Sequence, residues 1–237
     1  MALIVGSGCV FNNVIDKDID HLMRRTCDRV LVKGLVSPLV ALVYGSFLGL
    51  LGFIILFIAT NLLTVFVAIV GWLFYVVVYS LFLKRKSIWG TTLGAISGAV
   101  PPVAGYCAIA GKFDLAAVLL FLILFFWQMP HFYAIAIYRL RDFKAAGIPV
   151  LPAIRSMLYT KIEMTLYVVA YLVASLLLAY FGYAGSIYFA MALCLGVVWL
   201  ALVIEGFFAV NHPRWARRVF FFSIIEITVL SMAMISH

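Results

Sequence analysis

Amide and carboxylate residues recur every four positions near the start of the chain. Asn12, Asp16 and Asp20 stand at positions i, i+4 and i+8, so a helix would place them along one face. Like charges at this spacing repel each other, and a divalent cation removes the repulsion. Oxygen ligands of this kind suit Mg²⁺, which binds through one or two carboxylates together with substrate phosphate oxygens. The spacing therefore predicts a site for a metal and a phosphate-bearing substrate.

Basic residues follow the acids in the same loop. Arg24, Arg25 and Arg29 lie within reach of the same substrate, and guanidinium groups match the geometry of phosphate. Asp18 points off the common face, so we expect it to pair with a neighbouring cation. The alternative is a solvated loop that simply carries many charges, and the spacing alone does not exclude it.

A second charged segment follows after a long apolar stretch and reads Tyr138-Arg139-Leu140-Arg141-Asp142-Phe143-Lys144. A single aspartate among cations is more often an ion-pair partner than a metal ligand. Asp142 is therefore a candidate for the site only if it faces the first loop. We expect that it does so across the bundle.

The composition assigns the chain to the membrane. It is 67% hydrophobic and 11% charged, with a mean hydropathy of +1.19, whereas about a quarter of the residues in a soluble domain are charged. Lys33 and Lys84 are separated by an uncharged stretch, and about 50 residues of helix, roughly 75 Å, cross a hydrocarbon core of about 30 Å twice. The polar Ala59-Thr60-Asn61 is the natural position for the hairpin between the two spans.

The same criterion, applied throughout, predicts an all-α transmembrane bundle. Lipid-exposed backbone must satisfy its hydrogen bonds within the segment, and the polar alternation of a β-barrel is absent. We expect one integral-membrane domain over residues 1–237, with a partial span at residues 1–11 that indicates an N-terminally truncated chain. The seven full spans are expected at residues 37–58, 62–83, 88–110, 114–138, 163–182, 185–209 and 218–236.

The basic residues predict the orientation of the chain. Of its 17 Lys and Arg residues, all but Lys112 fall within residues 17–33, 84–86, 139–161 and 214–218. These clusters occupy every second connection, so the positive-inside rule places them, and with them both acidic loops, on the cytoplasmic side. The net charge of +8 then reflects topology, and no basic folded domain supports nucleic-acid binding.

A few polar residues fall inside predicted spans. His131, in Trp127-Gln128-Met129-Pro130-His131, is either a functional group or a hydrogen-bonded structural histidine, and the sequence favours neither. For Glu205 and Glu226 we expect hydrogen bonds between helices rather than catalysis. The stripe Gly90, Gly94 and Gly98 predicts close helix packing, and Pro101-Pro102 is expected to bend or break that helix.

These motifs together resemble the UbiA superfamily of intramembrane prenyltransferases, and the resemblance covers essentially the whole chain. Its quinone-directed members usually carry an aspartate where this chain has Asn13 and another where it has Ala146, whereas the heme-directed branch shares both differences. The motifs that carry the resemblance are Asn12-x-x-x-Asp16-x-x-x-Asp20, Arg25-Thr26-x-x-Arg29 and Tyr138-x-x-x-Asp142, with closer matches to the heme-directed branch over residues 9–35, 83–85, 97–106, 127–131 and 142–149.

The resemblance implies a function and a set of site residues. Farnesyl diphosphate would be the donor and heme B the acceptor, in a nine-helix fold of which this chain lacks the first span and the outer half of the second. Asp16, Asp20 and Asp142 would bind Mg²⁺, with Asn12 and Asn13 beside them. The diphosphate-binding cations would be Arg25, Arg29, Lys84, Arg85 and Arg141, and the residues in contact with heme would be Tyr106, His131 and Tyr138.

The same resemblance implies the cellular setting and the alternatives. It places the protein in the bilayer of a bacterial inner membrane, with heme A synthase or a terminal oxidase assembly as partners. One alternative is polyprenyl transfer to an aromatic quinone precursor. A second is a membrane transporter, which would place ionisable groups near the bilayer midplane and show an internal repeat, whereas the acidic motifs here lie at the membrane edge.

Overall fold

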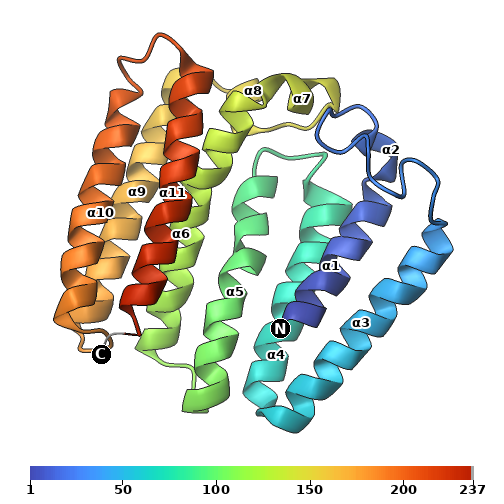
Figure 1. Cartoon of the computed structure of the whole chain (residues 1–237), viewed down its shortest axis with the longest axis horizontal. Helices are drawn as coiled ribbons and strands as arrows, with labels where there is room; N and C mark the ends of the chain where they lie inside the picture. Colours follow the sequence, from blue (N-terminus) through green and yellow to red (C-terminus); the bar gives the residue numbers. More distant parts are fainter. Residues whose placement is uncertain (236–237) are drawn as a thin grey trace. The chain divides into compact units, whose positions relative to one another are not determined.

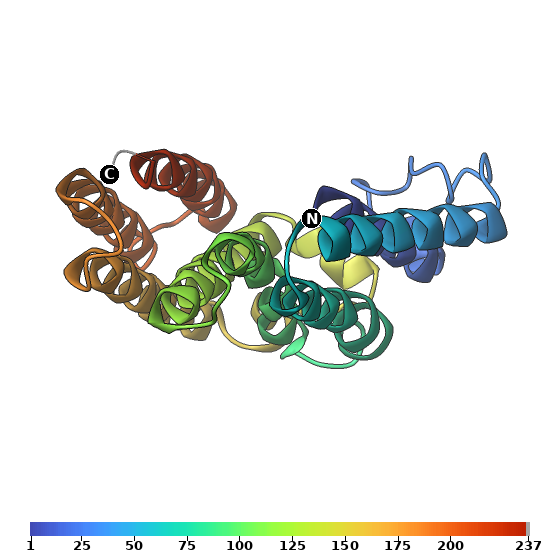
Figure 2. The same ribbon diagram turned by 90° about the horizontal axis from the view of Figure 1, so that it is seen from below.

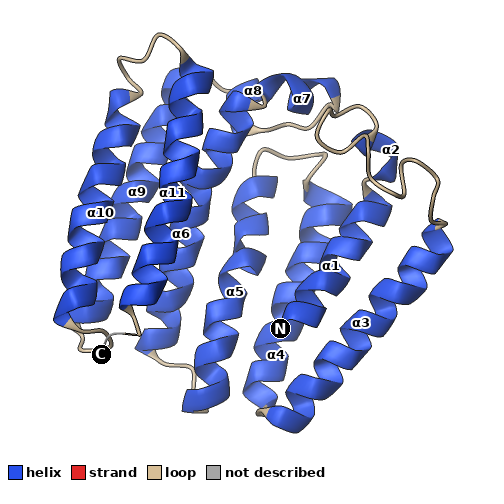
Figure 3. Ribbon diagram, in the orientation of Figure 1, coloured by secondary structure: helices blue, strands red, loops and turns tan. Residues whose placement is uncertain are grey.

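The computed structural model describes residues 1–235, and every regular element within that range is a helix (Figure 3). The helices form two compact units. The first contains residues 1–113 and 141–149, and the second contains residues 114–140 and the chain from Val150 onward. The charged segment around Asp142 therefore belongs to the same unit as the first acidic loop.

The expected multispanning all-α class is confirmed. The helices long and apolar enough to cross a membrane are α3 (Pro38–Ala59), α4 continued by η1 (Leu62–Leu83), α5 (Gly90–Ala110), α6 (Leu115–Tyr138), α9 (Met157–Tyr180) and α10 (Ser186–Glu205). The seventh expected span is a helix, α11 (His212–Ala233), but it carries Arg217, Arg218 and Glu226. The count of seven full spans is therefore not confirmed, and the last residue of that expected span, Ser236, lies outside the described residues.

In the first unit, α1 (Ala2–Ile15) packs mainly against α3 and also contacts α4 and η1, while α5 packs against α4 and η1 (Figure 1). Glycine permits the closest approach between α1 and α3. A Cβ atom added to Gly52 would lie 2.7 Å from Cγ1 of Ile4. Similarly, a Cβ atom on Gly94 would lie 2.8 Å from the Tyr79 ring, which agrees with the packing role expected for that glycine.

The second membrane-crossing helix changes its winding before it ends. Residues Phe74–Leu83 form a π-helix, η1, in which hydrogen bonds skip one residue more than in an α-helix. Accordingly, the Lys84 N–H donates to the Tyr79 carbonyl at 2.9 Å. Long π-helical segments are rare and often lie at functional sites. Here η1 ends directly before Lys84 and Arg85, so its wider turns decide where these two cations point.

The hairpin predicted at Ala59–Asn61 is confirmed. The Asn61 side chain accepts a hydrogen bond from the Thr64 N–H at 2.9 Å, which caps α4, and its Nδ2 donates to the Cys107 carbonyl near the end of α5 at 2.8 Å. This end of the first unit is opposite the end that carries α2 (Lys17–Asp20), α7 (Leu140–Ala145) and the turn after η1 (Figure 1). Helix α5 continues through its two prolines to Ala110, so they do not break it.

The second unit is a ring of four helices. Helix α6 packs against α9 and α11, and α10 packs against the same two helices (Figure 2); the single-turn α8 (Leu151–Ile154) precedes α9. Helix α9 begins six residues earlier than predicted because the Ser156 side chain accepts a hydrogen bond from the Tyr159 N–H at 3.1 Å and caps it. The centre of the unit holds Tyr171, Tyr188 and Trp199, all completely buried.

The two glutamates of this unit differ from each other. Glu205 lies at the exposed end of α10 and pairs with Arg218 of α11 at 2.6 Å, so it does link two helices. Glu226 is completely buried, but neither of its carboxylate oxygens makes a hydrogen bond of standard geometry to a described residue. Its carboxylate does interact with the Tyr171 hydroxyl on α9, so the expected hydrogen bond between helices stays a prediction at Glu226.

Candidate functional site

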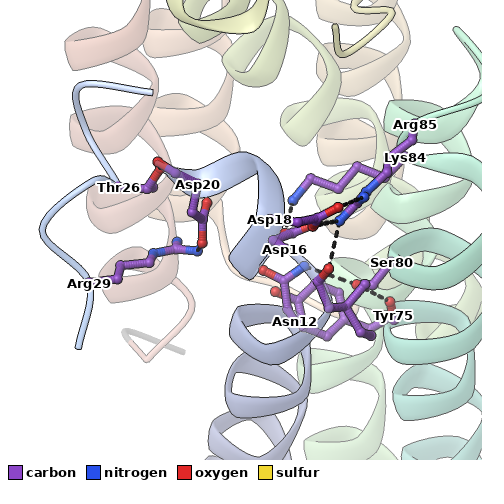
Figure 4. A network of polar contacts seen from close by, with 11 residues as sticks. Asn12, Asp16, Asp18, Asp20, Thr26, Arg29, Tyr75, Ser80, Lys84 and Arg85 are labelled. Atoms are coloured by element: carbon purple, nitrogen blue, oxygen red, sulfur yellow. Dashed lines mark hydrogen bonds and ion pairs between the residues drawn. The ribbon is translucent and has the colours of Figure 1, made fainter. Parts of the chain in front are cut away.

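One end of the first unit carries a cluster of charged and amide side chains, which we call the acidic network (Figure 4). Its central member is Asp16, a completely buried residue between α1 and α2. Lys84 donates a hydrogen bond to its Oδ2, and Nη2 of Arg85 lies 3.7 Å from its Oδ1. The network consists of Asn12, Asp16, Asp18, Asp20, Arg29, Ser80, Lys84 and Arg85.

Asp18 and Arg85 form a two-pronged ion pair. Arg85 donates from Nη1 to Oδ2 of Asp18 at 2.7 Å and from Nη2 to Oδ1 at 2.6 Å, and Nη2 also donates to the Ile15 carbonyl at 2.6 Å. The hydrogen bond from Arg85 holds the pKa of Asp18 below its ordinary value of 3.8, and the same contact raises the pKa of Arg85. The prediction that Asp18 pairs with a cation is confirmed, although the cation comes from a distant turn.

Asp20 forms a separate branch of the network. Nη1 of Arg29 donates to its Oδ2 at 2.5 Å, and the Thr26 hydroxyl donates to its backbone carbonyl at 2.9 Å. Figure 4 shows Asp20 directed toward Arg29 and away from Lys84. The prediction of one face shared by Asp16 and Asp20 is wrong, because α1 ends at Ile15 and the chain turns at Asp16 before α2 begins.

Amide and hydroxyl groups join α1 to the π-helix beneath the charges. The buried Asn12 donates from Nδ2 to the Ser80 hydroxyl at 3.0 Å, and that hydroxyl donates to the Tyr75 carbonyl at 2.8 Å. This link holds Asp16, one helical turn beyond Asn12, in register with Lys84. Asn13 is half-buried, and its side chain makes no hydrogen bond to another described residue.

The other expected members of the site stand outside these contacts. Arg25 and Arg141 are exposed, and within residues 1–235 neither pairs with a carboxylate. Asp142 is half-buried in α7, in the segment that belongs to the first unit. Both arginines therefore remain available to an anionic ligand.

The chemistry of the donor set can be compared with the needs of Mg²⁺. Across residues 1–235, no three acidic, histidine or cysteine side chains gather closely enough to enclose a metal ion. However, Mg²⁺ commonly binds through one or two carboxylates and completes its shell with substrate phosphates and water. Oδ1 of Asp16 is buried without a hydrogen bond and is an oxygen of the required kind. The residues thus fit a metal that arrives with its substrate.

Two pockets lie in the same unit as the acidic network, and one of them includes Asp18 of the network. An open pocket of about 540 Å³ is lined by Lys17, Asp18 and His21 among others, which makes it suitable for a polar group. An apolar pocket of about 200 Å³ lies between three helices: α1, α4 with its continuation η1, and α5. Gly8, Tyr75 and Val100 lie in its wall. Gly8 is one helical turn from Asn12, so an apolar chain in this pocket would begin close to the charged groups.

The second unit carries a different kind of site, which we call the histidine face. The His131 ring stacks on Trp127 of the same helix, with centroids 4.7 Å apart, and lies 4.8 Å from the ring of Phe220 on α11. The Tyr138 ring lies beneath the guanidinium groups of Arg139 and Arg217, at 5.3 and 5.8 Å. The face consists of Trp127, His131, Tyr138, Arg139, Arg217, Phe220 and Ser223.

Sequence reasoning found only part of this face. His131 and Tyr138 are predicted as contacts of the acceptor, whereas Arg217 is predicted only as a charge that sets the topology, and Phe220 and Ser223 are not predicted. Arg217, Phe220 and Ser223 follow one another at intervals of three residues, which predicts that they share one side of α11. This spacing is the sequence signal from which that side of the face can be predicted. The third expected acceptor residue, Tyr106, is half-buried on α5 in the first unit.

The span-forming helices and the paired acids and bases at one end of the first unit define an integral-membrane protein with a candidate site for an anionic ligand. Residues 1–225 match the UbiA prenyltransferase family, and the chain belongs to that family.

Individual relatives agree with this assignment. A protoheme IX farnesyltransferase of Yersinia pseudotuberculosis is 53% identical over 234 residues, which cover 99% of this chain and 79% of the relative. That of Photorhabdus laumondii is 51% identical, with 99% and 80% covered.

Two solved structures share the fold. A digeranylgeranylglyceryl phosphate synthase has a TM-score of 0.81 at 20% identity, with 99% of this chain and 81% of the other covered. A UbiA homologue from Aeropyrum pernix has a TM-score of 0.67 at 17% identity, with 96% and 85% covered.

Proposed function

We propose that this protein transfers the farnesyl group of farnesyl diphosphate to a vinyl group of heme B and adds water, which gives heme O and diphosphate. The observation that carries the proposal is the 53% identity to a protoheme IX farnesyltransferase along 99% of the chain. The acidic network and the apolar pocket beside it fit the two halves of a prenyl diphosphate, and the aromatic rings of the histidine face fit a flat macrocycle.

The cations of the first unit would receive the diphosphate. Lys84 and Arg85 already neutralise Asp16 and Asp18, whereas Arg25 and Arg141 are exposed and uncommitted to an acid. As the bond between C1 of the farnesyl group and the diphosphate oxygen breaks, negative charge grows on the leaving group. Positive groups held in advance at that position lower the energy of the transition state.

Asp16, with Asp20 and Asp142, is the proposed ligand set for Mg²⁺. The metal would neutralise the diphosphate and orient it for departure. Asp16 has the best support, because it is buried and its Oδ1 makes no hydrogen bond. Asp20 would have to share its carboxylate with Arg29. Asn12 would hold Asp16 in place through its bond to Ser80.

The carbon chemistry then needs an environment poor in water. Departure of diphosphate leaves an allylic cation at C1, which the heme vinyl group attacks to form the new carbon–carbon bond. Water adds to the resulting porphyrin-stabilised cation and loses a proton, giving the hydroxyethylfarnesyl side chain. The apolar walls of the pocket near Tyr75 would exclude water from the first cation.

The proposal includes a location. The span-forming helices and the bacterial relatives support the inner membrane of a bacterium, with the lipid bilayer around the bundle. The positive-inside rule favours a cytoplasmic position for the acidic network.

The test supplies each candidate acceptor separately. Membranes that contain the chain are incubated with radiolabelled farnesyl diphosphate and Mg²⁺, and either heme B or 4-hydroxybenzoate is added. We expect label only in a product with the mass of heme O. Label in prenylated 4-hydroxybenzoate would instead identify a quinone-precursor prenyltransferase, and uptake of label without a product would indicate a transporter.

A further inference from the structure

Ser223 makes two short contacts through one hydroxyl group. Its Oγ–H donates to the Phe220 carbonyl, one turn earlier in α11, at 2.7 Å. The same oxygen lies 2.7 Å from Nδ1 of His131 on α6. A serine hydroxyl has a single proton and two lone pairs. Since the proton is directed to the Phe220 carbonyl, the oxygen accepts a hydrogen bond from His131.

This arrangement selects the tautomer of the histidine. Nδ1 must carry the proton that it donates to Ser223, so Nε2 of the neutral ring keeps a free lone pair. Nε2 makes no hydrogen bond to any residue within 1–235, and the ring is only partly buried. An unprotonated Nε2 in an intramembrane position is the form of histidine that binds a metal ion.

The surroundings fix the ring as well as its proton. The Trp127 indole lies nearly parallel to the imidazole, with 26° between the planes, and its Nε1 donates to the Ser223 carbonyl at 2.8 Å. Ser223 is completely buried. Trp127 and Ser223 therefore hold His131 from two sides and resist rotation of the ring. Metal-binding histidines usually have such a partner on the other ring nitrogen, and losing it typically weakens metal binding about 10- to 100-fold.

We propose that Ser223 is a positioning residue that holds His131 as the Nδ1-protonated tautomer, so that Nε2 ligates the iron of bound heme B. This rests on the proposed function, since the iron belongs to the acceptor substrate. The rest of the face matches the same ligand: the Phe220 ring offers an apolar surface, and Arg139 and Arg217 offer cations for carboxylate groups.

The experiment measures the iron–histidine bond. The full chain, purified in detergent, is loaded with ferrous heme B, and the Fe–histidine stretching band is recorded by resonance Raman spectroscopy beside a heme titration. We expect the band in the unmodified protein and its loss in His131→Ala. Ser223→Val should shift the band to lower frequency and weaken heme binding about 10-fold. Ser223→Thr, which has the same shape as valine but keeps the hydroxyl, should restore both.

The controls separate positioning from general damage. Ser231→Ala removes a hydroxyl that also donates to its own helix, at the Ile227 carbonyl, and should leave the band unchanged. If Ser223→Val does not accumulate in membranes, Ser223→Ala makes the same deletion with a smaller side chain.

Two results would overturn the proposal: an Fe–histidine band that persists in His131→Ala, or one that is identical in the serine, valine and alanine proteins. Failure of the proposed function looks different, because the band would respond as expected while no heme O forms from farnesyl diphosphate.

Discussion

The acidic network and the histidine face stabilise their polar groups in different ways. Each places polar groups inside or beside the membrane, where an uncompensated charge is costly. The acidic network compensates charge with charge, as Lys84, Arg85 and Arg29 pair with three aspartates. The histidine face keeps His131 neutral and satisfies it with the Ser223 hydroxyl and stacked rings.

The difference indicates which ligand each region can accept. A network with charges of both signs can exchange an internal ion pair for a contact with a diphosphate or a metal ion. The histidine face presents a lone pair and flat apolar surfaces to a porphyrin, with Arg139 and Arg217 beside them as cations for its carboxylate groups. Donor and acceptor binding should therefore respond to separate perturbations.

Removal of divalent metal should have the largest effect. Chelation with EDTA is expected to reduce prenyl transfer to background and to weaken farnesyl diphosphate binding, because the diphosphate charge is then met by side chains alone. Added Mg²⁺ should restore both. The absorption spectrum of bound heme B should not change. Prenyl transfer that survives exhaustive chelation would contradict the proposal that the acidic network binds a metal ion.

The variant Asp16→Asn should have the second largest effect on prenyl transfer. The change preserves shape but leaves Lys84 opposite a neutral amide and removes a proposed metal ligand, so we expect turnover to fall at least about 100-fold. Protein abundance in the membrane and heme affinity should stay near normal. Asp28→Asn is the matched control, because Asp28 lies in the same loop, is exposed and pairs with the exposed Lys33. Equal losses in both variants would contradict a specific role for Asp16.

Trp127→Phe tests the histidine face with a moderate change. It keeps an aromatic ring over His131 but deletes the hydrogen bond from Nε1 to the Ser223 carbonyl. A loss of about 1 kcal/mol corresponds to roughly fivefold weaker heme B binding. The KM for farnesyl diphosphate should be unchanged. A larger change in the donor KM than in heme affinity would mean that the two regions are not separate.

Asp18→Asn should have the smallest effect, because the Asp18 side chain is 65% exposed and exposed ion pairs contribute less than about 1 kcal/mol. Arg85 lowers the pKa of Asp18, so the pair stabilises the fold above the ordinary pKa of 3.8 and this contribution is lost only as the pH falls through the lower, folded value. The difference in Tm between the two proteins should therefore be equal at about pH 5 and about pH 8 and shrink at about pH 3. A difference that changes between the two higher values would assign the effect to another group.

The sequence was sufficient to predict the helices. An uncharged run long enough to cross a bilayer twice, interrupted only at Ala59–Asn61, leaves few alternatives. The two observed spans, α3 and α4 continued by η1, begin and end within about one residue of the prediction. The predicted bounds are wrong where a side-chain cap extends a helix past its apolar part, as Ser156 does at the start of α9. The prediction is also wrong at Asp16, because a local turn interrupts the regular spacing on which the shared face depended.

Length and apolarity of the segments are enough to predict the class of protein, and the residue types show which chemical groups are available: acids, arginines and a histidine. Which of these groups become partners depends on the packing of the helices. Lys84 lies 68 residues from Asp16, and Ser223 lies 92 residues from His131. Such pairs depend on which helices pack together and in what register. Here the register is set by the π-helix η1, which ends directly before Lys84, and by the contact of α6 with α11. Hydrophobicity drives helices into the bilayer without specifying that register, which close packing and hydrogen bonding set afterwards.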